Sequence, residues 1–169
     1  MKRICLHGPE STGKSTLATR LSLHYGCEVV PEYGRAFCEA HGTDIDMAAL
    51  VHIAQTQDAM NARATARAGK MVLFDTDPLI TAVWAEMMFQ KHDAWFECFD
   101  NYADLYLLLD IDLPFVDDGL RVYAKPDDRR HFFHLCKAEL DSRGVHYAII
   151  SGKGEQRLAA ALDAVAAHC

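Results

Sequence analysis

Within the stretch HGPESTGKST (7–16), residues 8–15 match the pattern G-x-x-x-x-G-K-[ST] in full. The run RICLHG (3–8) is typical of a buried strand, and residues 14–25 place apolar side chains at helical spacing. A glycine-rich turn between a strand and a helix is the structural context in which this pattern holds phosphate. The stretch therefore predicts a phosphate-binding loop rather than a chance cluster of small residues.

The residue types of this loop fit the task of holding a nucleotide. Backbone N–H groups must wrap the phosphates, so glycine is needed where a side chain would collide, and the helix that follows points the positive end of its dipole at the anion. We expect Lys14 to reach the β- and γ-phosphates of ATP and Ser15 to offer its hydroxyl to Mg²⁺. The predicted nucleotide-binding residues of the loop are Gly8, Glu10, Ser11, Thr12, Gly13, Lys14, Ser15 and Thr16.

Outward from the loop, the chain alternates between strand and helix patterns. Apolar runs predict strands at 3–8, 27–32, 71–77, 104–111 and 146–152, and helical patterns cover 14–25, 46–68, 78–90, 93–101, 127–143 and 154–167. The runs are nearly continuous, which is typical of strands buried on both faces of a parallel sheet. We predict an α/β fold, the three-layer sandwich of P-loop NTPases, with a five-stranded parallel sheet of order 2-3-1-4-5 and helices on both faces. A single domain is expected over 1–169, with a small lid at approximately 113–130.

Composition narrows the classes of partner. The net charge of −7 over 169 residues disfavours nucleic acid and anionic membrane surfaces as partners. We see no signal peptide and no apolar stretch near the roughly 20 residues of a membrane span, so a cytoplasmic location is expected. Reduced thiols are expected at the cysteines, which are Cys5, Cys27, Cys38, Cys98, Cys136 and Cys169. A small-molecule partner fits these features, and the oligomeric state stays open.

Other residues bear on where the phosphate goes. The chain lacks an N-K-x-D segment for reading guanine, and its third strand ends in FDTD rather than the paired acids of a large oligomeric ATPase. A small-molecule kinase needs a metal-holding acid, a base and mobile arginines. Asp75 ends a strand where it could hold Mg²⁺ through water, and Asp77 could face the acceptor. Glu32 is a second candidate base, or else a helix N-terminal acid that complements the dipole.

Arginines supply the candidates for charge stabilisation. Arg35, one turn beyond Glu32, could bind phosphate or pair with Glu32. Arg121, Arg129 and Arg130 flank VYAKPDD, a polar segment that reads as a flexible lid closing over the phosphates. The alternative is that each of these arginines is an ordinary solvated charge.

Four motifs, GPESTGKS, PEYGR, FDTDPLIT and VDDGLR, occur in this order with a spacing that resembles a known family. The chain from Ile4 to about Arg157 is similar to the ribosylnicotinamide kinase domain of the bacterial multifunctional NAD biosynthesis regulators and its stand-alone relatives, often labelled AAA-family ATPases. The resemblance implies phosphorylation of the 5′-hydroxyl of nicotinamide riboside by ATP. The adenylyltransferase domain of the multifunctional members has no counterpart, and we expect a chain that is complete as a kinase.

The resemblance also implies roles for particular positions. Glu32 and Tyr33 would lie beside the acceptor nucleoside, Asp75 and Asp77 would serve the metal and the ribose, and adenine would lie near 152–157. The predicted catalytic residues are Lys14, Glu32, Asp77, Arg121 and Arg129. The predicted acceptor-binding residues are Glu32, Tyr33, Arg35, Asp75, Asp77, Phe115, Asp117 and Asp118, and Arg130 and Arg157 join the nucleotide-binding set.

Two positions depart from the family pattern, which often has tryptophan before E-Y-G-R and before V-D-D-G. This chain has Pro31 and Phe115 there, so Phe115, Tyr33 or Trp84 would have to stack on a nicotinamide ring, or else they pack in the core. Two rival functions therefore stay open: a kinase for another nucleoside or small alcohol, and a regulatory ATPase without an acceptor. The choice between Glu32 and Asp77 as base, and between ATP and GTP, is also open.

Overall fold

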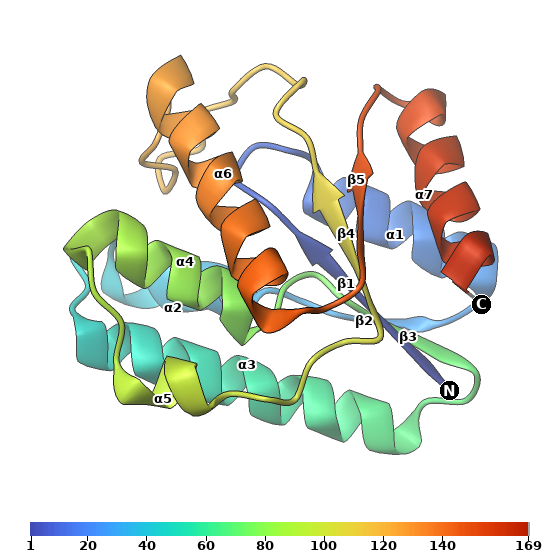
Figure 1. The fold of residues 1–169 in the computed structure, drawn as a ribbon, viewed down its shortest axis with the longest axis horizontal. Coiled ribbons are helices and arrows are strands. Elements are labelled where there is room, and N and C mark those ends of the chain that lie inside the picture. Colours follow the sequence, from blue (N-terminus) through green and yellow to red (C-terminus); the bar gives the residue numbers. More distant parts are fainter. Residues whose placement is uncertain (169) are drawn as a thin grey trace.

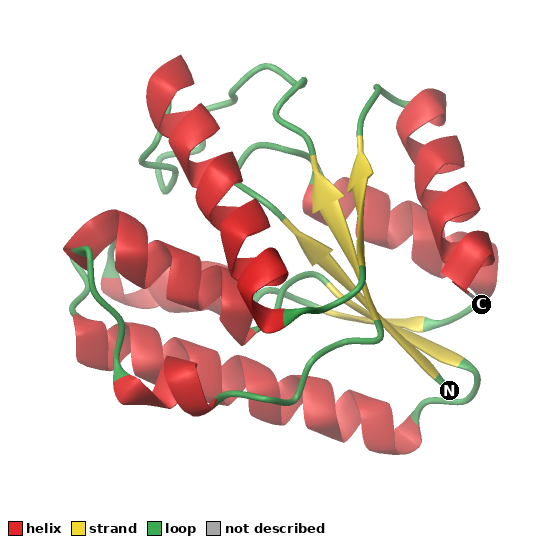
Figure 2. Cartoon of the chain, in the orientation of Figure 1, coloured by secondary structure: helices red, strands yellow, loops and turns green. Residues whose placement is uncertain are grey.

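A computed structural model describes residues 1–168, and within them a five-stranded parallel sheet forms the centre of the molecule (Figure 2). The strands are β1 (Lys2–His7), β2 (Glu28–Val30), β3 (Met71–Phe74), β4 (Leu105–Leu109) and β5 (Tyr147–Ile150). Their order is β2-β3-β1-β4-β5, which confirms the predicted topology. β1 is central, and its Ile4 pairs with Leu73 on one side and with Leu105 on the other.

Helices connect the strands. They are α1 (Lys14–Tyr25), α2 (Tyr33–His41), α3 (Met47–Arg67), α4 (Pro78–Phe89), α5 (Ala94–Cys98), α6 (Pro126–Arg143) and α7 (Glu155–His168). All six predicted helices are confirmed, although α5 ends three residues earlier than expected. Helix α2 was not predicted as a separate element. It has nine residues and none of them is buried.

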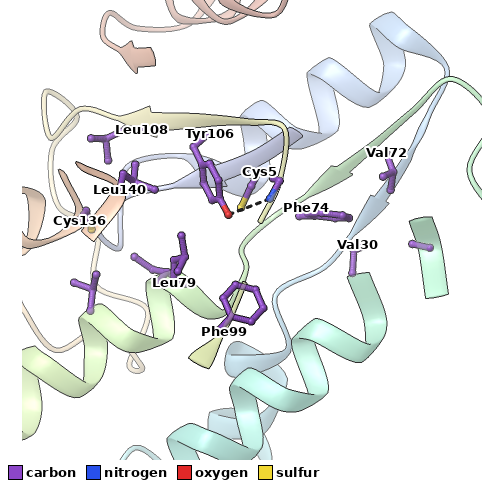
Figure 3. Close-up of a cluster of buried hydrophobic side chains, with 14 of the residues drawn as sticks. Cys5, Val30, Val72, Phe74, Leu79, Phe99, Tyr106, Leu108, Cys136 and Leu140 are labelled. Carbon is purple, nitrogen blue, oxygen red and sulfur yellow. Dashed lines mark hydrogen bonds between the residues drawn. The ribbon is translucent and has the colours of Figure 1, made fainter. Parts of the chain in front are cut away.

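Each face of the sheet is covered by its own set of helices, which makes three layers (Figure 1). One face packs against α1 and α7, through Ile4, Leu6, Leu107, Leu109, Leu17, Leu21, Ala161 and Val165. The other packs against α3, α4 and α6, and Figure 3 shows part of that cluster around Cys5, Phe74, Leu79, Tyr106, Leu108, Cys136 and Leu140. Successive residues of β1 and β4 point to opposite faces, so both of these strands are buried on both sides.

Two further predictions from the sequence concern the cysteines and membrane-spanning segments. The five cysteines within residues 1–168 are unpaired, and Cys169 lies outside the described residues. In that same part of the chain, no helix is both long and apolar enough to span a bilayer.

Because all five strands run in one direction, their carboxyl ends lie at one edge of the sheet. The loops after β1, β2, β3 and β4 therefore converge there, and they carry most of the predicted site residues. This edge is where ligands bind in open parallel sheets.

Candidate active site

The loop between β1 and α1 has the backbone that the motif predicts. Gly8 has φ 129° and Gly13 has φ 82°, and both values lie in the region that favours glycine. A Cβ at Gly8 would lie 2.9 Å from the carbonyl oxygen of Leu109, so a larger residue would push the loop away from β4. The buried Thr12 hydroxyl donates to the Pro9 carbonyl at 2.8 Å and braces the loop from inside.

The loop carries positive charge from the Lys14 side chain and from the N-terminus of α1. Lys14 Nζ lies 2.9 Å from both the Gly8 and the Pro9 carbonyl oxygens, which holds the ammonium group over the loop. Helix α1 begins at Lys14 and has no acidic residue in its first turn, so no side chain there opposes the positive end of its dipole. Loop amides, a lysine and a helix N-terminus together form an anion site of the kind that holds nucleotide phosphates.

A cavity of about 350 Å³ opens beside this loop, toward α2, α3 and α4. Its wall opposite the loop is largely apolar, with Ile45, Leu50, Ile53, Ile80, Trp84 and Met88. Its polar residues outside the loop include Glu32, Arg35, Gln57, Thr76, Thr81 and Arg121. An apolar hollow with a few converging polar groups next to an anion site is suited to a small molecule that has a flat ring and hydroxyl groups.

Glu32 and Arg35 both line the cavity, but they do not pair with each other. Glu32 is the N-cap residue of α2, yet its side chain makes no capping hydrogen bond with that helix. The Arg35 guanidinium instead forms an ion pair with Asp118 at 2.9 Å.

Asp75 lies beneath the loop next to Ser15. Burial is the main cause that raises the pKa of Asp75 to about 6, and a hydrogen bond from Ser15 and the charge of Lys14 partly oppose it. Among residues 1–168, its buried Oδ1 has no hydrogen-bond partner. A carboxylate with a free oxygen beside a hydroxyl at the end of a phosphate-binding loop fits the ligand chemistry of Mg²⁺.

Asp77 faces away from the cavity, into the core between α4 and β4. It is 2% exposed, accepts a hydrogen bond from the Leu79 amide at 3.0 Å, and accepts another from the Tyr106 hydroxyl. Burial raises the pKa of Asp77 to about 7, although these hydrogen bonds partly oppose the shift. Asp77 thus caps α4 and bridges it to β4, whereas Asp75, two residues earlier, faces the loop.

The buried Asp77 predicts a pH dependence of stability. Its pKa is higher in the folded chain than the ordinary value of 3.8, so its stabilising contribution is full below about pH 4 and is lost as pH rises through about 7. The unfolding free energy of the wild type, minus that of Asp77→Asn, should fall by about 2 kcal/mol between pH 5 and 8. Urea unfolding across this range measures it, with exposed Asp163→Asn as control. Parallel curves for wild type and Asp77→Asn would contradict it.

The segment 113–125, here called the lid segment, crosses over the phosphate-binding loop. The Glu10 carboxylate accepts hydrogen bonds from the amides of Val122 at 2.7 Å and Tyr123 at 2.8 Å. The Ser11 hydroxyl accepts from the Val116 amide at 2.8 Å. The lid segment therefore lies against the loop in this structure, and the predicted lid range up to 130 also includes the first turn of α6.

Several further predicted residues lie in or beside the lid segment. Arg121 lines the cavity and pairs with Asp118 at 3.2 Å, so Asp118 holds both cavity arginines. The exposed Asp117 accepts from the Gly119 amide at 2.9 Å, which shapes the turn. Phe115 does not line the cavity, and its ring lies 5.9 Å from the Arg129 guanidinium.

The remaining predicted cations lie outside the cavity wall. Arg129 is buried and donates to the Leu113 carbonyl at 3.0 Å, while Arg130 is exposed and pairs with Asp127. Arg157 is 4% exposed, forms an ion pair with Asp112 and donates to the Thr12 carbonyl. Its guanidinium supports the underside of the loop instead of projecting into the cavity.

The aromatic residues of the cavity differ from most of the expected ones. The Tyr33 ring points away, toward Phe37 and His52. Trp84 does line the cavity, and its ring lies 5.5 Å from that of Tyr123, which sequence reasoning did not select. Tyr123 lies in a polar segment with no periodic pattern, so only the closure of the lid segment reveals its place.

Together, the 2-3-1-4-5 sheet and the loop define the class: this is a P-loop nucleotide-binding protein with the fold of small-molecule kinases. Residues 3–157 match the model of a family described as an AAA domain. The chain belongs to that family.

Relatives of known name share parts of this chain. The trifunctional NAD biosynthesis/regulator proteins NadR of Salmonella typhimurium and Escherichia coli are each 29% identical over an alignment of 158 residues, which covers 87% of this chain. The chain spans 37% of the length of these curated relatives. A crystal structure of NadR in complex with NR matches with a TM-score of 0.85 and 26% identity, over 99% of this chain and 51% of that one. A deoxyadenosine kinase from M. mycoides, 10% identical at a TM-score of 0.67, shares the fold.

Proposed function

We propose that the chain is an ATP-dependent kinase that phosphorylates the 5′-hydroxyl of nicotinamide riboside and yields nicotinamide mononucleotide. The observation that carries the proposal is the position of Glu32, which lines an apolar cavity directly beside the phosphate-binding loop. A nucleotide hydrolase needs no such cavity beside its phosphate-binding loop. The similarity to a NadR structure that holds NR supports the choice of acceptor.

In the proposed reaction, the loop amides and Lys14 hold the phosphates of ATP. The acceptor hydroxyl loses its proton to Glu32 as its oxygen bonds to the γ-phosphorus, while the bond from that phosphorus to the β–γ bridging oxygen breaks and ADP leaves. Arg35 and Arg121 line the same cavity and would stabilise the charge on the transferred group. Ser15 and Asp75 would hold Mg²⁺, which supplies charge neutralisation at the phosphates.

The side-chain directions favour Glu32 over Asp77 as the base. Asp77 caps α4 and bonds to Tyr106 inside the core, so it could reach an acceptor only by giving up both contacts. Glu32 has no such competing hydrogen bond within its own helix.

The apolar wall suits the ring of the acceptor. Trp84 is half-buried and lies on the cavity with Tyr123, and it replaces the stacking surface that Pro31 does not offer. An aromatic surface of this kind attracts a cationic pyridinium ring by electrostatics as well as by contact.

The test compares ADP release from ATP and Mg²⁺ with no acceptor, with nicotinamide riboside, and with a panel of common nucleosides. We expect nicotinamide riboside to raise ADP release about 10²-fold or more over hydrolysis alone, with nicotinamide mononucleotide identified by mass. Activity with another nucleoside alone would show that the proposed acceptor is wrong and that the proposed phosphoryl transfer is right. Hydrolysis that no acceptor changes would favour a regulatory ATPase and overturn the proposal.

A further inference from the structure

Two buried primary amides, Gln57 and Asn61, lie one helical turn apart on α3, between the loops that follow β2 and β3. Gln57 is 1% exposed and Asn61 is 4% exposed. Burying an amide costs free energy unless its donors and acceptor are hydrogen-bonded, and apolar residues fill most of this face of α3. The partners of the two amides therefore indicate what they do.

Gln57 holds the backbone on both sides of Glu32. Its Oε1 accepts from the Tyr33 amide at 2.7 Å, and its Nε2 donates to the Pro31 carbonyl at 3.2 Å. A backbone N–H only donates and a carbonyl only accepts, so one orientation of the Gln57 amide satisfies both. The two peptide groups that flank Glu32 are thus attached to a single side chain.

Asn61 extends this contact to the neighbouring loop. Gln57 Nε2 also donates to Asn61 Oδ1 at 3.1 Å, and Asn61 Nδ2 donates to the Thr76 carbonyl at 3.2 Å. Thr76 directly follows Asp75, so a continuous chain of hydrogen bonds joins the loop of Glu32 to the loop of Asp75.

The two loops need such a connection because they carry like charges. Glu32 and Thr76 line the same cavity and Asp75 directly precedes Thr76, so the two carboxylates lie on neighbouring loops. Beyond the last pair of the β2–β3 register, the Asp75 amide donates to the Val30 carbonyl at 2.9 Å, and past this point the Gln57–Asn61 contacts join the loops.

We propose that Gln57, oriented by Asn61, is a positioning residue that holds Glu32 in place relative to Asp75 and the phosphate-binding loop. The inference rests on the proposed function, since Gln57 acts on the reaction through Glu32. A displacement of about 1 Å at a reacting group can cost 10²-fold in rate, so holding the backbone around the base has a direct effect on turnover.

The first experiment is a double-mutant cycle between Gln57→Met and Glu32→Gln. Methionine keeps the size of glutamine but removes all three hydrogen bonds. We expect Gln57→Met to lower kcat by about 30-fold with Glu32 present, and by less than about 3-fold in the Glu32→Gln background, with KM for ATP within about 2-fold. Equal losses in both backgrounds would show that Gln57 acts only on the stability of the fold and would overturn the proposal. Gln55→Met on the exposed face of α3 is the matched control.

The second experiment does not depend on activity. Hydrogen exchange of the Tyr33 amide, followed by NMR, should become about 10-fold faster in Gln57→Met and stay unchanged in Gln55→Met. Unchanged exchange in Gln57→Met would overturn the positioning role whatever the enzyme does. If the wild type shows no acceptor-dependent ADP release, the proposed function fails. The exchange measurement still tests whether Gln57 holds the Tyr33 amide.

A second variant covers a failure of Gln57→Met to fold. The ionised side chain in Gln57→Glu retains an acceptor for the Tyr33 amide but cannot donate to Pro31 or Asn61, so we expect a loss of kcat of about 10-fold that again requires Glu32. A kcat equal to that of the wild type in this variant would overturn the role of the Pro31 and Asn61 contacts.

Discussion

Replacing Lys14 with alanine is expected to lower kcat/KM for ATP by about 10³-fold, or roughly 4 kcal/mol of transition-state stabilisation. The Lys14 ammonium lies over the loop, 2.9 Å from the carbonyls of Gly8 and Pro9. From there it can exchange these hydrogen bonds for contacts with the phosphates of ATP. Its charge acts where negative charge is concentrated during transfer, and the loop amides that remain are dipoles and carry no full charge. Steady-state ADP release measures the effect.

The control for this prediction is Lys70→Ala, which removes the charge of an exposed lysine just before β3, far along the chain from the loop. It should leave kcat/KM within about 2-fold of the wild type, because an isolated surface charge is screened by solvent. Near wild-type turnover of Lys14→Ala would show that the loop does not hold the reacting phosphates.

Replacing Glu32 with glutamine is the second prediction with a large expected effect. Glutamine keeps the size and most of the packing of Glu32 but cannot accept the proton of the acceptor hydroxyl, so kcat should fall by about 10²- to 10⁴-fold. The KM for ATP should stay close to that of the wild type, because the nucleotide is held on the other side of the cavity by the loop.

Asp77→Asn is the matched comparison, since it makes the same carboxylate-to-amide change two residues after Asp75. We expect it to lower kcat by less than about 10-fold, through small shifts of α4. A larger loss in Asp77→Asn than in Glu32→Gln would identify Asp77 as the base and would contradict the assignment drawn from the cavity.

The shared ion pairs of Asp118 affect how the cavity arginines work. Arg35 and Arg121 both pair with this one carboxylate on the lid segment. In the proposed reaction, a bound phosphoryl group would compete with Asp118 for them, and the lid segment and the anion would then be coupled through the same two side chains.

The sequence alone was sufficient for the loop and for the sheet. Residues 8–15 are contiguous, so the glycine positions and the start of α1 follow from local chain geometry. The five apolar runs predicted the strands, and strand–helix alternation predicted their parallel order, because right-handed crossovers leave few topologies. The predicted strands end one to three residues beyond the observed ones, because the predicted ranges include residues of the loops that follow the strands.

The tertiary structure alone decided which side chains face the cavity. The sequence placed both Asp75 and Asp77 at the site, but Asp77 finds a partner in Tyr106, nearly thirty residues away, and turns into the core. Gln57 reads as one more member of a helical stripe, yet its amide binds the backbone around Glu32. These contacts join residues far apart in the chain, and their hydrogen-bond partners are set by packing between elements, which no local pattern encodes.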